Sequence, residues 1–94
     1  MVLPKLHLMI QGKVQGVGFR YHTSRKAKAL GLKGWVRNTR EGHVECVAVG
    51  EESVLEIFLK WCWEGSPASK VTAVEIVERG EAEPFTDFFI NETV

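Results

Sequence analysis

The stretch KLHLMIQGKVQGVGFRYHTSRKAKAL, residues 5–30, contains the pattern of a strand, a glycine-rich turn and a helix in that order. Within them, residues 5–11 alternate apolar and more polar positions, which predicts a strand with one apolar face. Residues 20–30 contain no Pro or Gly and place small and apolar side chains at helical spacing. They are followed by Gly31, a residue typical of the position just after a helix. The three glycines between the two patterns therefore predict a tight turn from a strand into a helix.

Four more strands and one more helix are predicted downstream. Two strands flank Glu41 and Gly42, a hairpin signal, and the helix precedes Gly65 and Pro67, which end it. In chain order these elements are a strand over 33–39, a strand over 43–49, a helix over 53–64, and strands over 71–78 and 85–90. The segment between the last two strands, RGEAEP, is expected to be polar and exposed.

The second predicted helix, SVLEIFLKWCWE at 53–64, carries both a start signal and an apolar face. Ser53 and Glu56 have the spacing of a capping box, so we expect them to cap its N-terminus. Its buried stripe is expected to contain Val54, Ile57, Phe58, Trp61 and Cys62.

The predicted order β-α-β-β-α-β, with a short terminal strand, indicates the α+β class. An antiparallel sheet with two helices on one face gives a ferredoxin-like two-layer sandwich. We expect residues 1–94 to form a single domain. This fold carries many functions, so the function has to come from a site.

The charge is unevenly distributed although the net charge is zero. Residues 1–43 contain nine Lys and Arg against one acidic residue, whereas residues 44–94 contain three against eleven. An anion site is therefore expected in the N-terminal half. The alternative is that the two halves only complement each other.

Composition also argues against several classes of protein. No apolar run approaches the roughly 20 residues of a membrane span or the core of a signal peptide, which predicts a cytoplasmic protein without membrane contact. Cys46 and Cys62 lie in apolar stretches and are expected to be buried free thiols. The three histidines show no ligand spacing, so metal binding is not expected.

The glycine-rich loop is the candidate for chemistry. Its backbone N–H groups can form an anion-binding nest at the start of a helix. Arg20 falls in the first helical turn, where a cation is unfavourable unless an anion lies beside it. We therefore expect a phosphate to be bound by Gln15, Gly16, Val17, Gly18, Phe19 and Arg20. A tight turn with no ligand remains the alternative from spacing alone.

Three stretches together resemble the acylphosphatase family: GKVQGVGFR at 12–20, ALGLKGWVRN at 29–38 and EGHVE at 41–45. The resemblance implies a ferredoxin-like fold and hydrolysis of the carboxyl–phosphate bond of acyl phosphates, with inorganic phosphate as a product and no metal or cofactor. It also implies that Arg20 binds the phosphate and that Asn38 orients the attacking water.

Within this interpretation each loop residue has an expected role. Gly16 and Gly18 serve the backbone geometry, Gln15 and Val17 contribute N–H groups rather than side-chain chemistry, and Phe19 anchors the helix in the core. A monomer is expected.

Two alternatives remain open. One is a non-catalytic RNA-binding module, although the pI of about 6.8 and the lack of paired aromatic side chains on the strands argue against nucleic acid. The other is a domain of a larger maturation protein, which the short chain disfavours.

Overall fold

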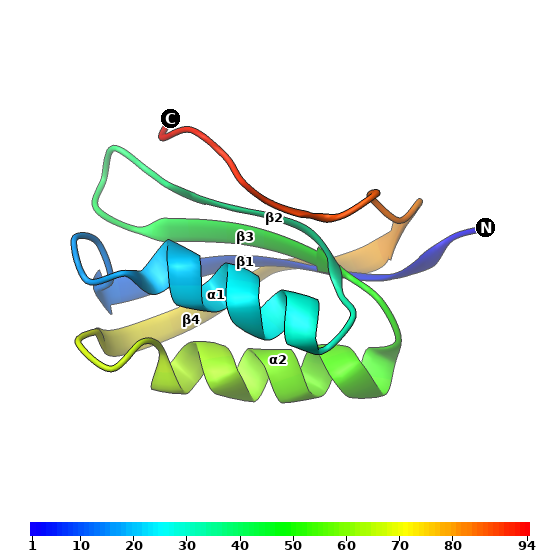
Figure 1. Cartoon of the computed structure of the whole chain (residues 1–94), viewed down its shortest axis with the longest axis horizontal. Coiled ribbons are helices and arrows are strands. Elements are labelled where there is room, and N and C mark those ends of the chain that lie inside the picture. Colours follow the sequence, from blue (N-terminus) through cyan, green and yellow to red (C-terminus); the bar gives the residue numbers. More distant parts are fainter.

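The computed structural model describes residues 1–94 as one sheet covered on one face by two helices (Figure 1). The observed elements are β1 (Leu3–Lys13), α1 (Phe19–Ala29), β2 (Lys33–Asn38), β3 (Val44–Val49), α2 (Glu52–Glu64), β4 (Lys70–Ala82) and β5 (Phe88–Ile90). The predicted order of elements and the ferredoxin-like fold are confirmed. Neither helix has the length and apolar character needed to cross a bilayer.

The sheet has the strand order β4-β1-β3-β2-β5, which puts β1 and β3 in its interior. The four long strands pair antiparallel, as predicted, but β5 runs parallel to β2 and makes the sheet mixed. The register explains the direction of β5. Lys33, at the start of β2, lies at the same end of the sheet as Gly80, near the end of β4, because both align with Lys5 through neighbouring strands. A short crossing at that end therefore brings β5 in parallel to β2.

The core lies between the sheet and the helices. Leu6, Leu8 and Ile10 of β1 face the helices and are fully buried, which confirms the predicted apolar face of the first strand. Phe19 of α1 and Phe58 of α2 cover them in the same cluster. This single apolar layer fixes the start of α1, and with it the loop that precedes the helix.

Cys46 and Cys62 are buried free thiols, as predicted. Burial raises the pKa of both thiols, which keeps them protonated and unreactive at neutral pH.

Two predicted details of α2 are wrong. The helix begins at Glu52, because the N–H groups of Val54 and Leu55 both donate to the carbonyl oxygen of Glu51, and no side chain caps it. Ser53 therefore lies inside the first turn and the predicted capping box is absent. Ile57 is half exposed and Leu55 is buried instead, since Leu55, Phe58 and Cys62 form the stripe that faces the sheet.

The fourth strand is longer than predicted. Residues 79–82 of the expected polar connection continue β4, pairing with the first residues of β1 as far as Leu3 with Ala82. An edge strand can carry such polar residues because its outer side faces solvent.

Candidate active site

The loop after β1 has the backbone geometry that its glycines allow. Gly16 and Gly18 have φ values of 74° and 72°, in the left-handed region that L-residues with a side chain rarely adopt. Gly18 is also the N-cap residue of α1, and no side chain caps the helix there. The predicted role of both glycines in the backbone geometry is confirmed.

The loop presents unpaired backbone N–H groups. The first hydrogen bond of α1 runs from the N–H of His22 to the carbonyl of Gly18, and no N–H group of residues 15–21 donates to another protein atom. Such a run of free amides at a helix N-terminus is typical of an anion-binding site.

Ser66, just after α2, orients one of these peptides. Its buried hydroxyl donates to the carbonyl oxygen of Val17 over 3.0 Å. In a trans peptide the carbonyl and the following N–H point in opposite directions, so this bond turns the Gly18 N–H away from Ser66. Gly18 lines a pocket whose lining residues do not include Ser66.

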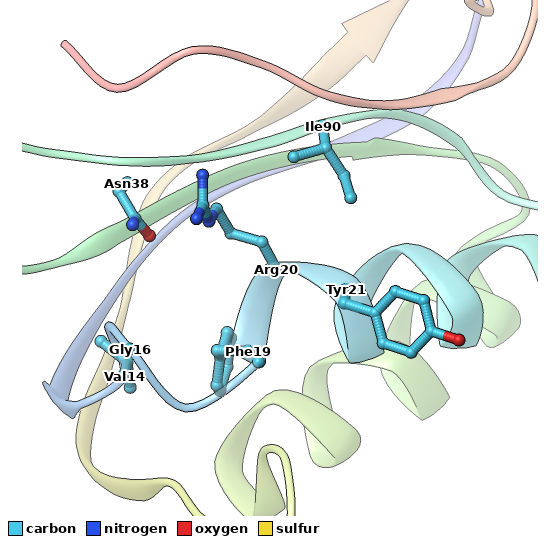
Figure 2. Close-up of a pocket in the computed structure, with 8 residues that line it drawn as sticks. Val14, Gly16, Phe19, Arg20, Tyr21, Asn38 and Ile90 are labelled. Carbon is cyan, nitrogen blue, oxygen red and sulfur yellow. The ribbon is translucent and has the colours of Figure 1, made fainter.

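This pocket has a volume of about 220 Å³ and lies where the loop, α1, β2 and β5 meet (Figure 2). Its lining residues are Val14, Gly16, Gly18, Phe19, Arg20, Tyr21, Asn38 and Ile90. None of these side chains is a carboxylate, an imidazole or a thiol. The structure thus brings together five of the seven predicted site residues, while Gln15 and Val17 do not line the pocket.

Arg20 supplies the positive charge of the pocket. It lies in the first turn of α1, which contains no acidic residue, and it takes part in no ion pair. Its guanidinium points across the pocket toward Asn38 (Figure 2). An unpaired cation beside free amides favours a bound anion.

Asn38 supplies an unpaired acceptor on the opposite wall. It is the last residue of β2 and pairs with Val44 of β3. Its carbonyl oxygen Oδ1 is buried and has no hydrogen-bond partner. An unsatisfied buried acceptor costs about 1–3 kcal/mol, so a group that completes this bond would bind there favourably.

The side chain of Gln15 ties the loop to the hairpin that carries Asn38. Its Nε2 donates to the carbonyl oxygens of Thr39 and His43, both over 2.8 Å. The expectation that Gln15 contributes only its N–H was therefore incomplete. Sequence reasoning missed this contact because backbone carbonyls, which any residue provides, are the partners.

The last residues of the chain support Asn38 from outside. The N–H of Val94 donates to the carbonyl of Asn38 over 3.3 Å, and the N–H of Arg40 donates to the carbonyl of Val94 over 2.7 Å. Figure 1 shows this end of the chain lying along β2. No sequence signal marked these contacts, which again involve only backbone groups.

Comparisons with known proteins identify the family of this chain. The model of the acylphosphatase family matches residues 6–90. An acylphosphatase of Marinobacter nauticus is 46% identical over 88 residues, which cover 94% of this chain and 96% of that relative.

Solved structures give the same result. An acylphosphatase from Coxiella burnetii has a TM-score of 0.88 at 40% identity and covers 96% of this chain and 93% of its own. Full-length HypF in its phosphate- and nucleotide-bound form has a TM-score of 0.85 at 29% identity. That alignment covers 99% of this chain and 12% of HypF.

Proposed function

The chain belongs to the acylphosphatase family and is an enzyme that hydrolyses acyl phosphates, and we propose that the reaction takes place in the pocket between Arg20 and Asn38. The observation that carries this proposal is the buried, unpartnered Oδ1 of Asn38 on the wall opposite an unpaired arginine. The first group suits a water molecule and the second suits a phosphate.

In the proposed complex, the phosphoryl group lies in the glycine-rich loop. The free N–H groups of residues 15–20 and the guanidinium of Arg20 donate to its oxygens. These donors are fixed before the substrate arrives, and they stabilise the charge that spreads over the phosphoryl oxygens in a loose transition state. Gln15 and Val17 take part through their backbone, and Phe19 holds the start of the helix.

Asn38 orients the attacking water in this proposal. Its Oδ1 accepts one hydrogen bond from the water and directs a lone pair of the water oxygen toward phosphorus. The new bond joins that oxygen to phosphorus, and the bond between phosphorus and the acyl oxygen breaks. The carboxylate leaves with the electron pair, and the water proton passes to a phosphate oxygen or to solvent.

This machinery suits an activated substrate. A carboxylate is a good leaving group, so the reaction needs neither a strong general acid nor a general base. A phosphate monoester requires a far greater rate enhancement, which this set of groups does not supply.

All of these groups come from one chain, so we propose that the monomer, folded as one domain, is the active unit.

Hydrolysis of benzoyl phosphate in buffer containing EDTA tests the proposal. We expect turnover, with inorganic phosphate as a competitive inhibitor because it occupies the same loop. Sedimentation at the assay concentration tests the monomer. Turnover that requires an added metal ion, or inhibition by phosphate that is not competitive, would contradict this reaction scheme.

A further inference from the structure

The turn between α2 and β4 lies against the glycine-rich loop, although the two are far apart in the sequence. Figure 1 shows both at the same end of the molecule. Gly65 packs so closely against Phe19, the first residue of α1, that a Cβ on Gly65 would lie 2.9 Å from Cε2 of the ring. Ser66 follows, is only 3% exposed, and donates from its hydroxyl to the carbonyl oxygen of Val17. The reaction scheme proposed above gives Ser66 no part.

This hydrogen bond is the only one that the backbone of residues 14–17 makes. The side chain of Gln15 binds the hairpin, but that contact does not involve the peptide between Val17 and Gly18. Glycine adopts positive and negative φ about equally well, so Gly18 does not prevent this peptide from rotating by half a turn. The hydroxyl of Ser66 is therefore the only protein group that fixes its orientation.

The orientation of this peptide determines which of its two polar groups can meet an anion. With the carbonyl of Val17 bound to Ser66, the N–H of Gly18 points away from Ser66, and Gly18 lines the pocket. After half a turn the carbonyl of Val17 would take the place of that N–H. The partial negative charge on its oxygen would then repel a phosphate instead of binding it.

We propose that Ser66 is a positioning residue for phosphate binding, because its hydroxyl keeps the N–H of Gly18 directed toward the phosphate. This inference rests on the proposed function, in which the phosphate lies in the glycine-rich loop. Ser66 contacts neither the phosphate nor the water and acts only through this one peptide. Donors that are fixed before the ligand arrives bind it without a cost of reorganisation.

Calorimetric titration with inorganic phosphate tests the effect on binding without turnover. Ser66→Ala removes the hydroxyl, and we expect the dissociation constant of phosphate to rise about tenfold, because one N–H no longer donates to the anion. Ser69→Ala is the matched control. The hydroxyl of Ser69 donates to the carbonyl oxygen of Ser66 over 2.7 Å, and the N–H of Ser69 still donates to the same oxygen in that variant. Ser69→Ala should therefore bind phosphate as wild type does, and circular dichroism verifies the fold of both variants.

Steady-state kinetics separates a positioning role from general damage to the site. The N–H of Gly18 would contact the phosphoryl group both before and during the reaction. In Ser66→Ala we therefore expect KM for benzoyl phosphate to rise by about the same factor as the dissociation constant of phosphate, with kcat nearly unchanged. A large fall in kcat with an unchanged KM would contradict the positioning role.

The NMR signal of the Gly18 amide tests the orientation of the peptide in the absence of phosphate. In Ser66→Ala we expect this signal to shift and broaden as the peptide rotates, whereas Ser69→Ala should leave it as in wild type. If wild type bound no phosphate, the proposed function would fail, and a Gly18 signal altered only in Ser66→Ala would still support the role of Ser66 in holding the peptide. An unaltered Gly18 signal in Ser66→Ala, or an equal loss of phosphate affinity in both variants, would overturn the inference.

Discussion

The Nε2 atom of Gln15 lies 2.8 Å from the carbonyl oxygen of Thr39, the residue that follows Asn38. A second bond of 2.8 Å from the same atom reaches the carbonyl of His43 on the other side of the hairpin turn. One side chain thus ties the proposed phosphate loop to the hairpin turn that follows Asn38, the residue proposed to hold the water. We therefore expect the position of Asn38 relative to the loop to depend on these two hydrogen bonds.

Replacing Gln15 should therefore reduce turnover more than binding. Gln15→Leu removes the donor and leaves two carbonyl oxygens without this partner, so we expect the free energy of unfolding to fall by about 1–3 kcal/mol. The altered position of Asn38 should lower kcat about 10- to 100-fold. Steady-state kinetics and urea unfolding measure both effects, and an unchanged kcat in the folded variant would contradict the link.

Gln15→Glu offers a pH-dependent version of the same test. The carboxylate repels the two carbonyls, which favours the protonated acid, and the acid regains one donor. Its pKa should lie above the usual Glu value of about 4.3, so kcat relative to wild type should rise as the pH falls from 7 to 5. If the defect were purely steric, the ratio of the kcat of Gln15→Glu to the kcat of wild type would stay constant between pH 7 and pH 5.

Asn38→Ala should separate stability from activity. Because the wild-type Oδ1 is buried without a partner, removing it relieves an unfavourable interaction, and we expect the free energy of unfolding to stay the same or rise by about 1 kcal/mol. Thermal and urea unfolding test this expectation. A loss of several kcal/mol would show that the carboxamide has a structural role.

The two loop glycines should not tolerate a side chain. Gly16→Ala and Gly18→Ala each force an L-residue into the left-handed region, at a cost of about 1–2 kcal/mol. Turnover should also fall, because the new side chain displaces the backbone N–H groups of the loop that are proposed to bind the phosphate. Gly80→Ala is the control, since Gly80 has no positive φ and a new Cβ there would come no closer than 3.7 Å to Lys5. Equal stability losses at all three positions would contradict the conformational explanation.

Acid should destabilise the protein through Glu45, on the sheet face opposite the helices. Partial burial raises the pKa of its carboxyl, but hydrogen bonds and charge from His7 and Arg37 outweigh burial and lower the pKa overall. Because the pKa is lower in the folded state, this stabilisation is complete above the usual Glu value of about 4.3. It is lost as the pH falls through the folded-state value.

Glu45→Gln should therefore show a weaker loss of stability between pH 5 and pH 3 than wild type. Urea unfolding over this range measures the slope, and Glu41→Gln, at an exposed acid outside the ion pairs, serves as the control. If the free energy of unfolding fell equally with pH in wild type and in Glu45→Gln, the predicted role of Glu45 would be contradicted.

The sequence predicted those features that depend on side-chain pattern. The alternation of Leu6, Leu8 and Ile10 defined β1, and the glycines indicated the loop conformation. In α2 the apolar residues are almost continuous, so the pattern did not distinguish Leu55 from Ile57 as the buried position. The start of that helix depends on the backbone of Glu51, which side-chain propensities do not reveal.

The site was predictable only in part for the same reason. The role of Arg20 is predicted by the sequence because a cation is unfavourable at a helix N-terminus. Asn38 by itself is typical of a turn, and only the family resemblance implies its role. Val94 donates to the carbonyl oxygen of Asn38 and Gln15 donates to that of the next residue, Thr39, so both contacts end on backbone groups. Such partners are determined by the tertiary fold and leave no trace in the local sequence.

The central claim is that Arg20 binds the phosphate and Asn38 positions the water. Benzoyl phosphate hydrolysis, with inorganic phosphate as inhibitor, tests it most directly in Arg20→Ala and Asn38→Ala. We expect Asn38→Ala to lose about 100-fold in kcat while the inhibition constant of phosphate stays near wild type. Arg20→Ala should lose at least about 1,000-fold in kcat and most of the phosphate affinity. Wild-type turnover in either folded variant would contradict the account.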